Sequence, residues 1–200
     1  LILNPLQRVL KSKQLNEQNQ YLVKSAEKSS LQLFDLIYQI LELTKFETSN
    51  VETHLTTINF AKTVAKRYAD FEALAVNRKI DFQWNSAIQE DLYIKVDEYK
   101  FTTILKNLIS NALKFTSENG KVSIITKETL ENIEVSVTDT GRGIHKNDLP
   151  YVFNRYYQSK VSGDIMEGGT GIGLAICREY AEVMGGKIRV ESTYGQGSCF

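Results

Sequence analysis

Residues 167–176 read Glu-Gly-Gly-Thr-Gly-Ile-Gly-Leu-Ala-Ile, a glycine-dense segment that runs directly into an amphipathic stretch ending near Met184. This pattern predicts a loop that becomes a helix. Glycines let a backbone approach an anion closely, and the N–H groups and positive dipole end of a helix favour a phosphate there. An ordinary glycine turn before a helix has the same local pattern, so the motif alone leaves both interpretations open.

The composition is that of an ordinary globular protein. The chain has 200 residues, and its 24 basic side chains balance 24 acidic ones, which does not favour a nucleic-acid or membrane surface. No apolar run approaches the roughly 20 residues of a transmembrane helix, and the amino end lacks a signal-peptide pattern. Cys177 and Cys199 lack metal-ligand spacing and are interpreted as reduced thiols of a cytosolic protein.

The first 50 residues predict a helical hairpin. Residues 1–13 are helix-like, and Asn16 can cap a second helix that extends to about Phe46. Apolar positions in the second helix alternate at spacings of three and four, and a further apolar stripe adjoins them. Such a wide face requires more than one neighbour, so we expect a homodimer in which two hairpins form a four-helix bundle. Packing of this helix on the domain that follows it is the alternative.

Beyond residue 50 the pattern alternates between strands and helices. Strands are predicted at 55–58, 80–84, 92–96, 121–127, 132–138, 187–192 and from 198, and helices at 60–77, 98–116 and from the glycine segment to Met184. Asn59 and Asp97 are placed to cap the first two of these helices. The order predicts an α+β fold with a sheet on helices, two domains at 1–50 and 51–200, and a linker near 47–54.

The helix predicted over 98–116 carries a polar stripe beside its apolar face. At 100° per residue, Asn107, Asn111 and Lys114 share one edge. Buried amides are costly unless they are satisfied, and hydrated Mg²⁺ with phosphate oxygens would satisfy them while Lys114 adds positive charge. Two solvated or capping asparagines explain the spacing equally well.

Two further segments lie between this helix and the glycine segment. Asp139-Thr-Gly-Arg-Gly-Ile follows a predicted strand, where a carboxylate can accept a hydrogen bond from an exocyclic amine and glycines leave room for a flat ring. A plain hairpin turn is the alternative. Phe153-Asn-Arg-Tyr-Tyr is aromatic and precedes an irregular loop of about ten residues, a length typical of lids.

Together these segments resemble the four nucleotide-binding boxes of sensor histidine kinases. Residues 107–116 resemble the asparagine box, 139–144 the first glycine box, 153–157 the phenylalanine box and 169–176 the second glycine box. The resemblance covers essentially the whole chain, because residues 1–6 and 17–47 are similar to the family's dimerisation and phosphotransfer hairpin. It implies a two-layer α/β sandwich of the Bergerat type for residues 51–200. It also implies transfer of the γ-phosphoryl group of ATP to a histidine and onward to a response-regulator aspartate.

The resemblance assigns roles to individual residues. Asn111 would hold the Mg²⁺ that bridges the ATP phosphates, supported by Asn107 and Lys114, and Asp139 would read the adenine amine. The other residues implied in ATP binding are Phe115, Gly141, Gly143, Ile144, Arg155, Gly169, Thr170, Gly171, Ile172, Gly173 and Leu174. Arg155 departs from a simple match, because Gln158 occupies one of the positions where family members carry the phosphate-facing basic residue.

The implied partners are a second copy of the chain and the receiver domain of a response regulator, with neither nucleic acid nor membrane contacting this segment. The implied location is cytoplasmic, and a parent protein anchored in the bacterial inner membrane is compatible with it. Other ATPases of the same fold give the alternative function, a nucleotide-binding or dimerisation module or a kinase-like scaffold. Gyrase-like and chaperone-like relatives place a carboxylate base beside the asparagine. No Glu or Asp lies between Phe101 and Ser117, which favours the kinase.

The chain departs from the family in its phosphoacceptor. The family phosphorylates a histidine on the first hairpin helix, and residues 1–13 contain none. The sequence holds only His54 and His145, which are interpreted as ordinary polar positions. We therefore expect the acceptor just upstream of Leu1 and a trimmed strand at the carboxyl end.

Overall fold

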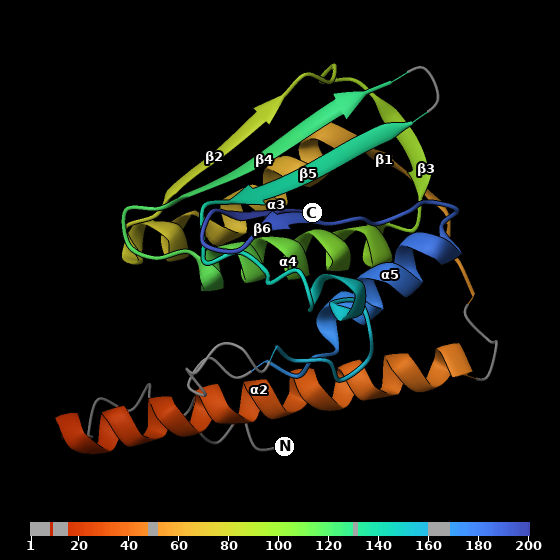
Figure 1. Ribbon diagram of the computed structural model, residues 1–200. Helices are drawn as coiled ribbons and strands as arrows, with labels where there is room; N and C mark the ends of the chain where they lie inside the picture. The colour runs from red at the N-terminus through yellow and green to blue at the C-terminus, as the bar shows by residue number, and fades with distance from the viewer. Residues whose placement is uncertain (1–8, 10–15, 48–51, 130–131, 160–168) are drawn as a thin grey trace. The chain divides into compact units, whose positions relative to one another are not determined.

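The computed structural model describes residues 9, 16–47, 52–129, 132–159 and 169–200. The chain divides into two compact units, Leu1–Asn50 and Val51–Phe200 (Figure 1). No helix within the described ranges is both long and apolar enough to cross a membrane. Nearly all of the helix expected over 1–13 and the central part of the linker expected near 47–54 lie outside these ranges.

The first unit is described as one long helix, α2 (Glu17–Glu47). Its start confirms the predicted cap, because the Asn16 side chain accepts a hydrogen bond from the Asn19 amide at 2.8 Å. Large apolar side chains are exposed along the helix at Tyr21, Leu22, Leu31, Leu33, Phe34, Ile37, Tyr38, Ile40 and Leu41. This exposure fits the expected partner helices, and the four-helix bundle itself stays a prediction.

In the second unit, two predicted caps mark the starts of helices. The Asn59 side chain accepts from the Lys62 amide at 2.9 Å and begins α3 (Phe60–Asn77). The Asp97 side chain accepts from the Lys100 amide at 3.0 Å and begins α4 (Glu98–Phe115). Helix α5 (Gly173–Val183) begins at the last glycine of the glycine segment, and no side chain caps it.

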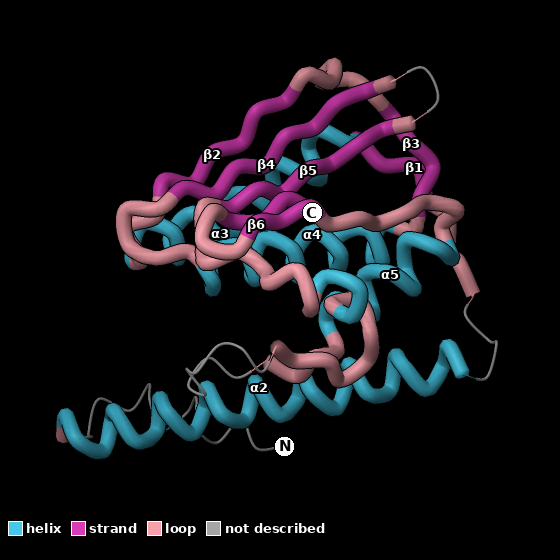
Figure 2. The backbone as a smooth tube through the Cα atoms, viewed as in Figure 1, coloured by secondary structure: helices cyan, strands magenta, loops and turns pink. Residues whose placement is uncertain are grey.

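The second unit is an α+β domain, as predicted, and its sheet is mixed. Its five-stranded sheet has the order β2 (Asp81–Ser86), β4 (Lys121–Glu128), β5 (Ile133–Asp139), β7 (Gly197–Cys199), β6 (Glu191–Thr193). Strand β2 runs parallel to β4, and the other neighbours are antiparallel. A separate two-stranded sheet pairs β1 (Thr56–Asn59) with β3 (Tyr93–Val96). Helices α3, α4 and α5 lie on one side of the larger sheet (Figure 2).

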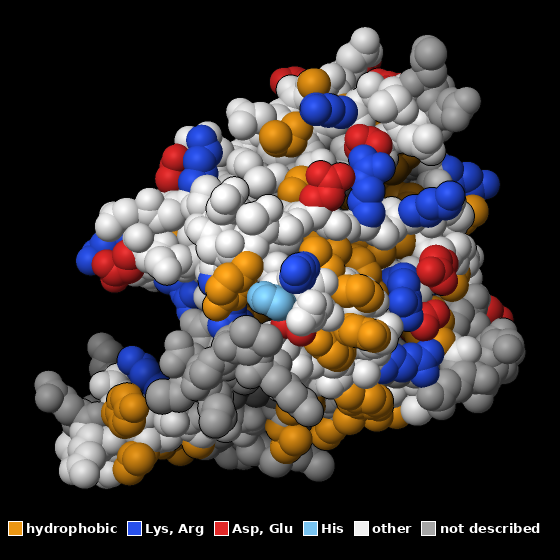
Figure 3. Space-filling view, viewed as in Figure 1, with side chains coloured by type: hydrophobic (Ala, Val, Ile, Leu, Met, Phe, Trp, Pro, Cys, Tyr) orange, Lys and Arg blue, Asp and Glu red, His pale blue; other side chains and the backbone are white. Residues whose placement is uncertain are grey.

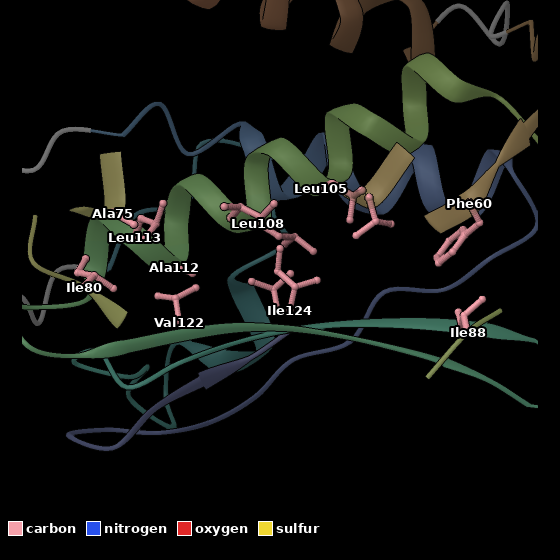
Figure 4. Close-up of a cluster of buried hydrophobic side chains, with 13 residues drawn as sticks. Phe60, Ala75, Ile80, Ile88, Leu105, Leu108, Ala112, Leu113, Val122 and Ile124 are labelled. Atoms are coloured by element: carbon pink, nitrogen blue, oxygen red, sulfur yellow. The ribbon is translucent and has the colours of Figure 1, made fainter. Parts of the chain in front are cut away.

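The core lies between α4 and the larger sheet. Leu105, Ile109 and Leu113 of α4 are buried, and Val122 and Ile124 of β4 face them (Figure 4). Each fully buried side chain of this size stabilises the fold by about 1.5–3 kcal/mol. The apolar face of α4 is therefore fixed on the sheet, which also fixes the direction of its polar edge.

One predicted strand is mostly wrong. Residues 187–190 are not in a strand, and only Glu191 and Ser192 of the predicted stretch belong to β6, which pairs with β7. Strand β7 is three residues long and offers no further partner, while Ile188 packs against the core. Alternating hydrophobicity here reflects core packing without a sheet ladder. The short 3₁₀ helix Leu149–Tyr151 was not predicted either.

Candidate functional site

The polar edge of α4 faces the start of α5. Asn107 is half-buried and donates through Nδ2 to the Thr103 carbonyl at 2.9 Å. A Cβ at Gly173 would lie 2.7 Å from Asn107 Oδ1, so the Asn107 side chain lies directly against this glycine. The structure thus brings together the asparagine box and the second glycine box, whose residues Asn107 and Gly173 lie 66 positions apart in the sequence.

Lys114 lies beside the other end of the glycine segment. Its Nζ would be 3.6 Å from a Cβ at Gly169, and it lies 4.8 Å from the ring centroid of Phe115. Asn111 is half-buried on α4, between Asn107 and Lys114. Asn107 therefore lies against Gly173 and Lys114 lies close to Gly169, and this side of α4 is lined with amide and ammonium groups.

Asp139 ends β5 as a buried carboxylate, 7% exposed. Burial raises the pKa of this carboxyl, more than its hydrogen bonds from the Gly141 and Ser198 amides lower it. The Gly141 amide donates to Oδ1 at 2.8 Å. A buried carboxylate that holds only backbone amides can still accept from a further polar ligand.

The first glycine box is held against the end of α4. A Cβ at Gly141 would lie 2.4 Å from the Phe115 carbonyl oxygen, so only glycine fits. Gly143 has a φ of +66°, and a Cβ there would lie 2.1 Å from the Thr193 carbonyl oxygen. The Arg142 guanidinium lies 4.5 Å from the Phe115 ring centroid. Sequence reasoning did not identify Arg142, since its contact with Phe115 appears only in the folded chain.

Close by in the chain, the Ile144 amide donates to Ser192 Oγ at 2.8 Å. This bond ties the end of the first glycine box to β6.

The phenylalanine box lies next to the second glycine box. The Tyr156 amide donates to the Gly171 carbonyl at 2.9 Å, and Gln158 Nε2 donates to the Gly169 carbonyl at 2.6 Å. Both Tyr156, at +63°, and Gly171, at +69°, have left-handed φ values, and a Cβ at Gly171 would lie 2.7 Å from the Tyr156 carbonyl carbon. A left-handed tyrosine is strained, and such strain is concentrated at functional segments.

Three other predicted residues lie in or beside the second glycine box. Ile172 is buried, and its amide donates to Thr170 Oγ1 at 3.1 Å, while Leu174 packs against the core. These contacts order the last turn before α5. They place Ile172 and Leu174 mainly in packing roles within the described residues.

Arg155 contacts α5. Its guanidinium forms an ion pair with Glu179, with Nη2 3.2 Å from Oε1. This pair ties the phenylalanine box to α5, and the implied role of Arg155 in ATP binding stays a prediction. Gln158 reaches the glycine segment through its hydrogen bond to the Gly169 carbonyl.

Asp148 is a buried residue that sequence reasoning missed. It accepts from the Tyr157 hydroxyl at 2.7 Å and from the Ser159 hydroxyl. These two hydrogen bonds hold the pKa of Asp148 below its ordinary value. Asp148 follows an irregular polar stretch with no periodic pattern, so no local signal pointed to it.

Two open hollows, of about 320 and 460 Å³, lie at the other end of α4. Both include Arg67, Glu98 and Thr102, and none of the predicted site residues lines either one. The candidate site is defined instead by the convergence of four sequence segments. Within the described residues, no cluster of three His, Cys, Asp or Glu side chains could hold a metal ion. A cation at this site would need amide, water or ligand oxygens.

Comparisons with known proteins agree with this arrangement. Residues 96–200 match the family model of histidine kinase-, DNA gyrase B-, and HSP90-like ATPases. Sensor histidine kinase WalK of Bacillus subtilis is 35% identical over 165 residues, which are 82% of this chain and 27% of WalK. The chain spans about a quarter of the length of WalK and 14% of the sensor protein EvgS of Escherichia coli, two of the curated relatives that it matches.

Two histidine kinases have similar structures. The catalytic domain of ThkA has a TM-score of 0.63 and 31% identity, covering 74% of this chain and 92% of that domain. Full-length ShkA in complex with AMPPNP has a TM-score of 0.81 and 25% identity, covering all of this chain and 41% of ShkA. A complex of ThkA with the response regulator TrrA has a TM-score of 0.67 and 23% identity, covering all of this chain and 55% of that ThkA chain, and shows the fold alone.

Proposed function

Because this chain belongs to the family of histidine kinase-, DNA gyrase B- and HSP90-like ATPases, we propose that it is the ATP-binding catalytic core of a two-component sensor histidine kinase. The observation that carries this proposal is the contact of α4 with the glycine segment. Asn107 meets Gly173 and Lys114 meets Gly169, so polar and basic groups line a glycine-rich backbone that leads into a helix. That combination suits a polyphosphate.

The residues around this contact fit Mg²⁺–ATP. Gly141 and Gly143 leave no room for a side chain, because the backbone of Phe115 and Thr193 lies close to them. Asp139 is proposed to accept from the adenine amine, beside the ring of Phe115. Asn111 is proposed as the Mg²⁺ ligand, with Asn107 and Lys114 in support. When bound, Mg²⁺ would neutralise charge on the transferred phosphoryl group.

Phosphoryl transfer is favoured over hydrolysis by the residues of α4. Between Phe101 and Ser117 the chain has no Asp or Glu, so the part of α4 around Asn107 and Asn111 supplies no carboxylate base for water. Transfer to an imidazole needs positioning and electrostatic stabilisation more than a protein base. A nucleotide-binding scaffold of the same fold is the second candidate, because neither His54 nor His145 lies on the described helix α2.

The proposed partners follow from the same role. The exposed apolar side chains of α2 support a homodimer through the first unit. A response-regulator receiver domain is proposed as the final phosphoryl acceptor, and the cytoplasm as the location. On the face shown in Figure 3, basic and acidic side chains of the described residues are interspersed, which suits neither a nucleic-acid nor a membrane surface.

The proposal is tested by calorimetric titration of the purified chain with ATP in Mg²⁺ and in EDTA. We expect saturable binding that weakens without Mg²⁺. Replacing Asn111 by Ala should remove this metal dependence, and Lys106→Met, at an exposed position of the same helix, serves as the control. If the folded chain does not bind ATP in Mg²⁺, the proposed function is wrong.

A further inference from the structure

A buried ion pair lies at the start of α4, away from the proposed nucleotide contacts. Lys100 Nζ lies 2.6 Å from Asp97 Oδ2, and the two side chains are 8% and 4% exposed. The same Nζ donates to the Glu52 carbonyl at 2.9 Å, and the same Oδ2 accepts from the His54 amide at 3.0 Å. The pair therefore holds both ends of segment 52–54, where the described part of the second unit begins.

Capping of α4 alone does not require this ion pair. The cap uses only Asp97 Oδ1, which accepts from the Lys100 amide at 3.0 Å, and asparagine or serine would serve as well. Burying two charges is unfavourable unless hydrogen bonds satisfy them. Burial alone would raise the pKa of Asp97, but hydrogen bonds from the Lys100 side chain and from the Lys100 and His54 amides hold it below its ordinary value. The other hydrogen bonds of the ion pair are made to the backbone of segment 52–54.

The same ammonium group also contacts the helix of the second glycine box. Lys100 Nζ lies 5.8 Å from the ring centroid of Tyr180, which is buried on α5. Tyr99 packs edge-on against that ring at 6.4 Å. One side chain thus touches segment 52–54, the start of α4 and the middle of α5. The two helices are those that carry the proposed phosphate contacts.

We propose that Asp97 and Lys100 are positioning residues that fix the point where the chain leaves the nucleotide-binding unit toward α2. The inference rests on the proposed function, because γ-phosphoryl transfer requires ATP to be brought in line with an acceptor histidine that is expected outside the nucleotide-binding unit. Release of segment 52–54 would lengthen the connection by three residues, roughly 10 Å when extended. The ion pair keeps this connection short and ties its origin to the nucleotide helices.

The test compares Lys100→Met with Lys106→Met. Methionine keeps much of the apolar length of Lys100 and removes its three polar contacts, whereas Lys106 is an exposed lysine on the same helix. Exchange of the His54 amide is followed by NMR. Distances between the two units are measured by pulsed spin-label spectroscopy, with nitroxides at the exposed positions Ser29 and Ala73 after substitution by cysteine. Cys199→Ser removes the half-buried thiol, and labelled chains are diluted with unlabelled ones.

In Lys100→Met we expect His54 amide exchange at least tenfold faster and a broader distance distribution, with the Kd for Mg²⁺–ATP within twofold of the parent chain. Lys106→Met should match the parent in all three measurements. Unchanged exchange and distances in Lys100→Met would overturn the inference, and so would a parent distribution already as broad as that of the variant. Loss of ATP binding in the parent would refute the proposed function, while the exchange and distance data would still decide the role of the pair.

A second pair of variants avoids the buried site if Lys100→Met does not fold. His54 has an exposed side chain, so His54→Ala keeps the amide that donates to Asp97 and His54→Pro removes it. A broader distance distribution in His54→Pro, but not in His54→Ala, supports the anchoring role. Equal distributions in the two variants contradict it.

Discussion

Replacing Asp139 by Asn separates nucleotide recognition from stability. Asparagine keeps the size of the side chain and an oxygen that can accept from the Gly141 amide, but it removes the negative charge. A hydrogen bond to a charged group is worth about 1.5–3 kcal/mol. Its loss should weaken ATP binding by about 10- to 150-fold. The amide could donate to the guanine carbonyl, so the preference for ATP over GTP should narrow or reverse.

The expected effect on stability has the opposite sign. Burial raises the pKa of Asp139 in the folded chain, so its contribution to folding is fully present below the ordinary value of 3.8. That contribution is lost as pH rises through the folded pKa, because ionisation of the buried carboxylate is then disfavoured. Asp139→Asn should therefore melt at the same or a higher temperature than the parent at pH 7. The advantage should shrink on acidification toward pH 4.

The assay combines calorimetric titration with ATP and GTP and thermal unfolding between pH 4 and pH 8. Asp81→Asn is the matched control, because Asp81 is an exposed strand residue whose carboxylate accepts from the Gln83 side chain. ATP affinity within twofold of the parent in folded Asp139→Asn would refute the adenine role. If Asp139→Asn melts clearly below the parent at pH 7, burial of the ionised Asp139 carboxylate does not destabilise the fold.

Four other outcomes are expected. Asn111→Ala should weaken ATP binding at least tenfold in Mg²⁺ and leave binding in EDTA unchanged, by calorimetry. Leu36→Glu should shift the chain from dimer to monomer at micromolar concentration, by sedimentation; a monomeric parent would contradict the bundle. Gly171→Ala should abolish ATP binding because a Cβ would meet the Tyr156 backbone, whereas Gly185→Ala, with φ +78° and nothing within 4 Å, should cost only about 1–2 kcal/mol of stability. The 200-residue chain should bind ATP without forming acid-labile phosphohistidine; labelling that is lost on changing His54 or His145 would contradict this.

Local chemistry made much of the fold predictable. The caps at Asn16, Asn59 and Asp97 depend on contacts three residues away, so they can be read from the sequence. The polar stripe of Asn107, Asn111 and Lys114 depends only on helix geometry. These features therefore predicted the starts of the long helices and the side of α4 that carries polar groups.

Contacts between distant residues were not predictable in the same way. Arg155 pairs with Glu179 across 24 positions, and Lys100 reaches the Glu52 carbonyl across 48. No periodicity in the chain encodes such a pair, because many other basic and acidic side chains have equivalent local patterns. The parallel pairing of β2 with β4 was not predicted from the sequence, for the same reason. The predicted strand at 187–192 failed because alternation reports burial and not the presence of a partner strand.

The proposed site joins two parts with different conformational demands. Asp139 ends a paired strand and Phe115 ends α4, so the side proposed to recognise the base is fixed by the core. The opposite side depends on Tyr156 and Gly171, both in left-handed conformations and joined by a backbone hydrogen bond. Left-handed backbone is costly for tyrosine, and strain of this kind is concentrated at functional segments. Under the proposed function, base recognition is preorganised, and the free energy of phosphate binding is partly used to hold the glycine segment in place.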